Sequence, residues 1–288
     1  MKSMKVAVNI RRHMMLPNFI CIGAYRAGTT WLYSVLSRHP QVFTSPEKEL
    51  LFFSRYYDRG IDWYKKFFED SADKRIRAEI CPAYLSYLEA PQRINRHIPG
   101  VKLMACLRNP VDQVYSHYNL GLVRGSYTKS FGSLVKDDNF VALQHALYAK
   151  HVSNYLRHFD KSQLLVLLYD DLLRDPKGLL KRVYRYLEID EYCPDFLNKR
   201  VNYSREPVFA PLDKFMADIG WVLRNRDFMR LKMGLNRLGI CNKLKQLNSR
   251  REAIKPIDSK VRQHLNGVFA EDKKALELML DTDLSAWQ

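Results

Sequence analysis

The chain has little cysteine and lacks any long apolar run. Its five cysteines are Cys21, Cys81, Cys106, Cys193 and Cys241, and no two of them form a CxxC pair. This spacing fits neither a zinc site nor a disulfide framework, so we predict reduced thiols in a cytoplasmic protein. No apolar stretch reaches 18 residues, which predicts that no segment spans a membrane. The first residues lack the apolar region of a signal peptide, and an anchor lost by cleavage or truncation stays an open alternative.

Glycine and proline are also scarce, with 12 of each among 288 residues. Together with 47% hydrophobic and 27% charged residues, this composition excludes a disordered or collagen-like chain. No linker rich in proline, glycine or serine divides the sequence. We therefore predict one domain over 1–288, with an α/β core over about 17–205 and a helical extension over about 206–288.

Acidic residues are outnumbered, because 31 Asp and Glu face 47 Lys and Arg, giving a formal net charge of +16. Part of the excess lies in residues 224–255. Such a charge favours an anionic partner, which could be a nucleotide, a nucleic acid, an acidic polymer or a membrane surface. Charge does not choose among these, and a basic surface that serves only solubility is the alternative.

Short apolar runs alternate with helical patterns along the first 200 residues. Runs of strand length occur at 18–23, 76–81, 101–107 and 163–169, and helical patterns at 29–38, 143–159 and 176–187. This alternation predicts a mostly parallel sheet flanked by helices. After about residue 200 the strand signal stops, and helices are expected at 211–223 and 258–280.

The turn after the first predicted strand has the composition of a phosphate-binding loop. Residues 23–31, GAYRAGTTW, follow the strand and open a helix, where backbone N–H groups and the helix dipole favour a phosphate. In the GxxxxGK[ST] pattern of nucleoside-triphosphate loops, Thr29 takes the place of the lysine, which argues against ATP or GTP hydrolysis. Arg26 supplies a cation instead, which suits a terminal 5′-phosphate that carries a group to be transferred. A plain strand–helix turn is the alternative.

A second candidate segment is LRNPVDQVYSHY at 107–118, where a predicted strand ends and a helix begins. Ligands of open α/β sheets bind at the carboxyl ends of strands. Arg108 could contact a phosphate through two nitrogens there, and Ser116 could add a hydroxyl. The alternative for Arg108 is a surface salt bridge.

With both segments in hand, the chain resembles the PAPS-dependent sulfotransferases, and most closely their carbohydrate branch with its heparan-sulfate and bacterial members. The similarity covers about 17–205 and returns in the tail sequence DLSAW. Four further segments match family blocks in order, namely PEKELLFF, EICPAYL, ALYAKHVSNYLRHF and LYDDLLRDP. The resemblance implies a P-loop-like fold, PAPS (3′-phosphoadenosine 5′-phosphosulfate) as sulfuryl donor and adenosine 3′,5′-bisphosphate as product.

The resemblance also assigns site residues. The set implied for PAPS is Arg26, Ala27, Gly28, Thr29 and Thr30 at the 5′-phosphosulfate, Trp31 near the adenine, Arg108 and Ser116 at the 3′-phosphate, and Lys199 and Arg200 in a late basic loop. Glu49 falls where the heparan-sulfate enzymes place a general base, and a carboxylate there could take the proton of an attacking hydroxyl. A solvated glutamate is the alternative.

Several positions depart from the family pattern. Arg26 stands where most members have lysine, and arginine can stabilise charge on the bridging oxygen but is a poor acid. Ile80 replaces a lysine, Leu51 replaces a histidine, and Cys193 has no near partner for a late disulfide. These departures affect the identity of the acceptor substrate more than that of the sulfuryl donor.

Candidate acceptor contacts are Tyr84, Tyr148 and His117, each with ordinary packing as the alternative, and no cluster has the spacing of a metal site. We expect transfer from PAPS to a hydroxyl or amine on a saccharide, with an anionic glycan as the candidate partner. A lipid or polyketide-type small molecule is the alternative acceptor. A basic nucleic-acid-binding protein is the alternative from another class, but the sequence contains no nucleic-acid-binding module. The oligomeric state stays open.

Overall fold

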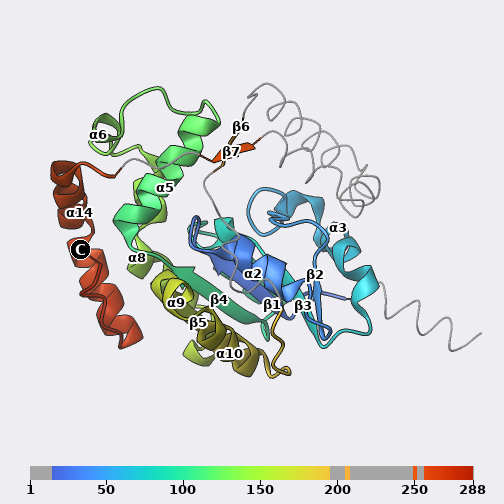
Figure 1. The fold of residues 1–288 in the computed structure, drawn as a ribbon. Helices are drawn as coiled ribbons and strands as arrows, with labels where there is room; N and C mark the ends of the chain where they lie inside the picture. The colour runs from blue at the N-terminus through green and yellow to red at the C-terminus, as the bar shows by residue number, and fades with distance from the viewer. Residues whose placement is uncertain (1–14, 195–204, 208–248, 252–255, 288) are drawn as a thin grey trace, which may run out of the picture.

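The computed structural model describes residues 15–194, 205–207, 249–251 and 256–287. Its centre is a five-stranded sheet in the order β2-β3-β1-β4-β5, in which all neighbouring strands are parallel (Figure 1). The strands are β1 (Phe19–Gly23), β2 (Val42–Thr44), β3 (Ile76–Ile80), β4 (Lys102–Leu107) and β5 (Leu164–Leu168). The predicted parallel sheet flanked by helices is confirmed.

The apolar runs form strands because both faces of the sheet are covered. All five residues of β1 are buried, and strands buried on both faces are near-continuously hydrophobic. Cys21 in β1, Cys81 after β3 and Cys106 in β4 are buried free thiols that pack in the same core. The strand-length runs predicted the positions of β1, β3, β4 and β5 within one or two residues. They missed β2, which has only three residues.

Helices occupy most of the connections between strands. They are α2 (Thr29–Leu36), α3 (Ile61–Lys65), α4 (Ala90–His97), α5 (Pro110–Val123), α6 (Phe131–Leu134), α7 (Val141–His145), α8 (Tyr148–Leu156), α9 (Tyr169–Arg174), α10 (Pro176–Leu187) and α14 (Ser259–Leu280). Short 3-10 turns lie at Tyr57–Arg59, Lys66–Ser71, Pro82–Tyr84 and Lys161–Gln163. None of these described helices combines the length and the apolar composition that crossing a membrane requires.

The single helix predicted at 143–159 is wrong, because the structure has α7 and α8 there with a break between them. The break is set by a distant partner. The Asp272 carboxylate of α14 accepts hydrogen bonds from the backbone N–H groups of Ala149 (3.0 Å) and Lys150 (3.3 Å), at the first turn of α8. A carboxylate at that end stabilises a new helix start, and local periodicity carries no sign of it.

The prediction that strands stop after about residue 200 is also wrong. β6 (Arg205–Pro207) and β7 (Ser249–Arg251) pair antiparallel in a separate two-stranded sheet. The helix expected at 211–223 and most of the basic stretch 224–255 lie outside the described residues.

The carboxyl-terminal segment packs back onto the core, and α14 runs beside α8 and α5 (Figure 1). Arg262 of α14 forms an ion pair of 2.7 Å with Asp112 of α5. After α14, the indole N–H of Trp287 donates to the Asp170 carboxylate over 2.9 Å. These contacts agree with one domain, which stays a prediction because residues 208–248 lie outside the described chain.

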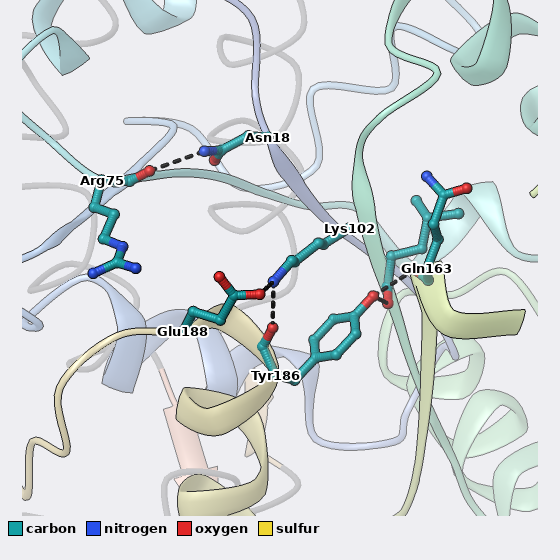
Figure 2. A network of polar contacts seen from close by, with 7 residues as sticks. Asn18, Arg75, Lys102, Gln163, Tyr186 and Glu188 are labelled. Atoms are coloured by element: carbon teal, nitrogen blue, oxygen red, sulfur yellow. Dashed lines mark hydrogen bonds and ion pairs between the residues drawn. The ribbon is translucent and has the colours of Figure 1, made fainter. Parts of the chain in front are cut away.

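Polar contacts bind helix α10 to the amino ends of the strands, as Figure 2 shows. At the start of β4, Lys102 Nζ donates to the Tyr186 carbonyl (2.7 Å) and pairs with Glu188 (2.6 Å). The Tyr186 hydroxyl donates to the carbonyls of Gln163 and Leu103. This end of the sheet is therefore fixed by side-chain contacts to the backbone, and the loops that carry the candidate site lie at the opposite, carboxyl end.

Candidate active site

The candidate site lies where the strand order changes direction. From β1 the chain passes to β2 and β3 on one side of the sheet, and then to β4 and β5 on the other. In open α/β sheets a ligand crevice forms at the carboxyl ends of the strands at such a switch point. The two segments singled out from the sequence leave β1 and β4, so the fold brings them to the same edge.

The loop after β1 is held by the neighbouring strand and ends at a glycine. Ala24 N donates to the Cys106 carbonyl of β4 over 2.8 Å. Gly28 precedes α2 with a φ of 86°, and a Cβ there would meet Leu172 Cδ2 at 2.6 Å. Within the described part of the chain, no side chain caps the amino end of α2. Its free N–H groups are therefore available to an anionic ligand.

The structure brings Arg26, Ser116 and Arg108 together from three separate elements. Arg26 Nε donates to Ser116 Oγ in α5 over 2.9 Å. Arg108, directly after β4, donates from Nη1 to the Arg26 carbonyl over 3.2 Å. The two sequence segments therefore form one continuous cluster. That these residues bind the two phosphates of a nucleotide stays a prediction.

The electrostatic setting of the cluster favours an anion. Burial lowers the pKa of Arg26, and the positive charges of Arg108 and Arg124 lower it further. Among the described residues, no carboxylate forms an ion pair with Arg26 or Arg108. The Arg108 guanidinium instead lies over the Tyr169 ring, 4.9 Å from its centre. Grouped cations without a carboxylate partner attract negative charge, and a bound phosphate would relieve their mutual repulsion.

Glu49 lies in the loop that follows β2, at the same edge of the sheet. Its N–H donates to the Ile80 carbonyl at the end of β3 over 3.1 Å, and its φ is 64°. The carboxylate pairs with Lys48 Nζ at 2.7 Å and its side chain is 38% exposed, so a ligand can reach it. Burial raises the pKa of Tyr25 in the phosphate loop, and the charge of Glu49 adds to that shift.

A ring cluster borders the loop on the side of α5. Tyr25 lies with its ring centre 4.9 Å from that of His145 and 6.1 Å from that of His117. Burial lowers the pKa of His117, and the charges of Arg26 and Arg124 lower it further. Burial lowers the pKa of His145 to about 4, and the neighbouring His117 and His151 contribute to the same shift. Both imidazoles are therefore neutral at pH 7. His117 lies beside the cation cluster, and its predicted contact with the acceptor stays a prediction.

Tyr84 and Tyr148 are placed in the core, which corresponds to the packing alternative. Both side chains are essentially inaccessible, and the Tyr84 hydroxyl donates to Glu79 over 2.8 Å. Trp31 is only 6% exposed and packs in the same core, so it offers little surface to an adenine. The remaining loop residues predicted for the nucleotide lie at the start of α2, where Ala27 and Thr29 are buried and Thr30 is exposed.

Lys199 and Arg200 lie outside the described residues. No group of three or more His, Cys, Asp or Glu side chains that could hold a metal ion occurs in the described ranges, and the metal-free reaction stays a prediction. The sequence reading missed Tyr25 and Tyr169. Tyr169 follows β5 directly, so its place at the carboxyl edge was a usable signal.

Comparison with known proteins places the chain among sulfotransferases. Residues 16–205 match the family described as the sulfotransferase domain. Human heparan sulfate glucosamine 3-O-sulfotransferase 3B1 is 34% identical over 207 residues, which cover 69% of this chain and 52% of the relative. Mouse heparan sulfate glucosamine 3-O-sulfotransferase 6 is 33% identical over 186 residues, covering 62% and 54%. The chain therefore spans about half the length of the curated relatives it matches.

A solved structure supports the fold of the described residues. The crystal structure of a sulfotransferase from Alicyclobacillus acidocaldarius aligns with a TM-score of 0.71 at 25% identity. The alignment covers 95% of this chain and 99% of the other. The P-loop-like fold predicted from the sequence is thereby confirmed.

Proposed function

The chain belongs to the sulfotransferase family, and we propose that it transfers a sulfuryl group from PAPS to a hydroxyl or amine of a heparan-sulfate-type saccharide. The observation that carries this proposal is the cluster of Arg26, Ser116 and Arg108 at the strand switch point. Two cations without a carboxylate partner among the described residues, beside an uncapped helix start, suit a ligand with phosphates at both ends.

The residues present fit PAPS as donor. The free N–H groups of α2, the Arg26 guanidinium and the exposed Thr30 would hold the 5′-phosphosulfate. Arg108 and Ser116 would hold the 3′-phosphate, and Gly28, with its φ of 86°, lets the loop turn into the start of α2. When bound, PAPS supplies the sulfuryl group together with a phosphate leaving group.

Two side chains have separate chemical roles in the proposed reaction, with Glu49 as the base and Arg26 as the cation at the leaving group. Glu49 takes the proton of the acceptor hydroxyl as the new S–O bond forms, and the S–O bond to the departing 5′-phosphate breaks. Arg26 donates hydrogen bonds to the oxygen on which negative charge grows. Arg26 keeps its proton throughout, because a guanidinium is not deprotonated at working pH even when its pKa is lowered.

A saccharide is favoured as the acceptor for two reasons. The curated relatives carry names of heparan sulfate glucosamine 3-O-sulfotransferases, and the chain has a net charge of +16, which suits an anionic glycan. A lipid or polyketide-type small molecule is the second candidate, because Leu51 replaces a histidine and Ile80 a lysine of the heparan-sulfate enzymes. Leu51 is partly exposed beside Glu49 and offers an acceptor an apolar surface, whereas Ile80 is fully buried in β3.

The test is transfer of labelled sulfate from PAPS to a panel of heparan sulfates, other glycans, lipids and small hydroxylated metabolites. We expect labelled heparan-type saccharide, and a loss of about 100- to 10,000-fold in rate for Glu49→Gln with the affinity for adenosine 3′,5′-bisphosphate retained. The exposed Glu89→Gln is the matched control and should keep the wild-type rate. Transfer to lipids alone would overturn the proposal that the acceptor is a saccharide. Absence of both transfer and bisphosphate binding would overturn the proposed sulfotransferase function.

A further inference from the structure

A fully buried carboxylate lies directly beneath the loop that carries Glu49. Glu79 belongs to β3 and is completely inaccessible to solvent. Its carboxylate accepts hydrogen bonds from the hydroxyls of Tyr64 (2.5 Å) and Tyr84 (2.8 Å) and from the backbone of Leu50. Burial raises the pKa of Glu79 to about 7, although these three hydrogen bonds act in the opposite direction.

The loop above Glu79 has an unusual backbone. Glu49 and Leu51 both have positive φ angles, 64° and 59°, and they flank Leu50. Residues other than glycine rarely adopt this conformation and keep it only where surrounding contacts impose it. The backbone of Leu50, between these two residues, interacts with the Glu79 carboxylate and is such a contact.

A second link runs through Tyr84. Its hydroxyl donates to Glu79 and accepts a hydrogen bond from Phe53 N over 3.3 Å. The Tyr64 ring stacks on Phe52, with centres 4.6 Å apart and an interplanar angle of 14°. The buried carboxylate thus holds the loop at Leu50 directly and at Phe53 through Tyr84. On the other side, Glu49 N is bound to the Ile80 carbonyl, one residue after Glu79.

Burying the Glu79 carboxylate costs folding free energy, so stability alone does not explain why a glutamate stands at this position. An apolar side chain at position 79 would avoid the desolvation of a carboxylate, since burying a charge is expensive even with partners. The hydrogen bonds of Glu79 converge on one loop and on the tyrosines that support it. Holding that loop in its strained shape is the role the geometry suggests.

We propose that Glu79 is a positioning residue that, through Leu50 and through Tyr84, sets the backbone of residues 49–53 and thereby the direction of the Glu49 carboxylate. This inference rests on the proposed function, because it takes Glu49 as the base. Glu79 itself is buried and does not touch the substrate.

The first test compares single variants by steady-state kinetics. Glu79→Gln keeps the size of the side chain but replaces one acceptor oxygen by a donor, so it breaks at least one of the three bonds. We expect kcat to fall by about 10- to 100-fold with the KM for PAPS unchanged, because misplacing a reacting group slows chemistry without weakening donor binding. Tyr84→Phe removes the hydroxyl that links Glu79 to Phe53 N and should also lower kcat. This variant replaces Glu79→Gln as the test if Glu79→Gln does not fold.

Tyr155→Phe is the matched control. Its hydroxyl is equally buried and donates to the Tyr84 carbonyl over 3.0 Å, but it forms no hydrogen bond with the Glu79 carboxylate. A merely structural hydrogen bond lost from this core should lower the melting temperature and leave kcat near the wild-type value. A drop in kcat for Tyr155→Phe as large as that for Tyr84→Phe would overturn the proposal.

The second test is a double-mutant cycle with Glu49→Gln. If Glu79 acts through Glu49, then Glu79→Gln causes no further loss in the Glu49→Gln background. An equal loss in both backgrounds, or a wild-type kcat for Glu79→Gln, overturns the inference and leaves the proposed function standing. Full activity of Glu49→Gln alone instead removes Glu49 as base, which is a failure of the proposed function.

Discussion

Arg26 Nε donates a hydrogen bond to Ser116 Oγ over 2.9 Å, although the two residues are 90 positions apart in the chain. The bond joins the loop after β1 to the helix after β4. It uses one guanidinium nitrogen, so the terminal nitrogens remain available for an anion. The three N–H donors of a lysine share one rotatable nitrogen, so lysine lacks the rigid fork by which a guanidinium holds Ser116 and directs other donors at a leaving group.

Arg26→Ala should therefore reduce turnover by about 100- to 1,000-fold, the usual cost of removing a donor aimed at developing charge. The affinity for adenosine 3′,5′-bisphosphate should fall much less, because Arg108 and the start of α2 remain. Steady-state kinetics and calorimetric titration of the bisphosphate measure the two effects. Arg96→Ala, which removes an exposed arginine of α4, is the charge control. An unchanged turnover number for Arg26→Ala would contradict the role.

Gly28→Ala should disrupt the phosphate loop. The residue has a φ of 86° and a Cβ would meet Leu172 Cδ2 at 2.6 Å, so alanine brings both strain and a clash. We expect a loss of about 1–3 kcal/mol in the free energy of unfolding, together with weaker bisphosphate binding. Gly267→Ala is the matched control, because nothing lies within 4 Å of its Cβ position. Being in a helix, that control should be neutral or stabilising by about 0.5–1 kcal/mol. Chemical denaturation of both variants decides between these outcomes.

The histidines beside the loop make stability depend on pH. In the folded state burial lowers the pKa of His145 to about 4, from an ordinary value of 6.5. As the pH falls through 6.5 the unfolded imidazole binds a proton and the folded one does not, so stability is lost between pH 6.5 and 4. Between pH 7 and 5 this group contributes a loss of about 2 kcal/mol.

His145→Phe keeps a ring against Tyr25 and removes that titration. Urea unfolding at pH 7 and 5 should then show a smaller difference in the free energy of unfolding than the wild-type chain shows. His264→Phe, at an exposed position of α14, should leave the difference unchanged. Equal acid sensitivity of His145→Phe and the wild-type chain would contradict the prediction.

The parts of the site that the sequence predicted are those fixed by short-range rules. β1 is a continuous apolar run, Gly28 ends the loop, and Arg108 follows β4 directly. Since parallel strands end at one edge, the meeting of Arg26 with Arg108 and Ser116 followed from the sheet alone.

The parts that the sequence did not predict depend on distant partners. The break before α8 needs Asp272, which lies 123 positions from Ala149. The core positions of Tyr84 and Tyr148 depend on how the loops close over the sheet. Glu79 reads as an ordinary charged residue in a strand, and only the folded structure shows that its carboxylate is buried beneath Leu50.

The tail offers a last prediction, because Trp287 connects it to the carboxyl edge of the sheet. Its indole N–H donates to Asp170, which is the neighbour of Tyr169, and the Tyr169 ring lies under Arg108. Trp287→Phe keeps most of the buried ring and loses the hydrogen bond to a carboxylate, which should cost about 1.5–3 kcal/mol. Trp287→Ala also leaves a cavity, and should cost about 3–5 kcal/mol.

Urea denaturation measures both losses, and Ser285→Ala at an exposed position of the same tail should stay within about 0.5 kcal/mol of the wild-type value. Because Asp170 adjoins Tyr169, Trp287→Phe should also weaken bisphosphate binding through Arg108, while Ser285→Ala should not. A Trp287→Ala variant as stable as the wild-type chain would show that the tail does not pack on the core in solution. A destabilised variant with unchanged bisphosphate affinity would confine the tail to a structural role.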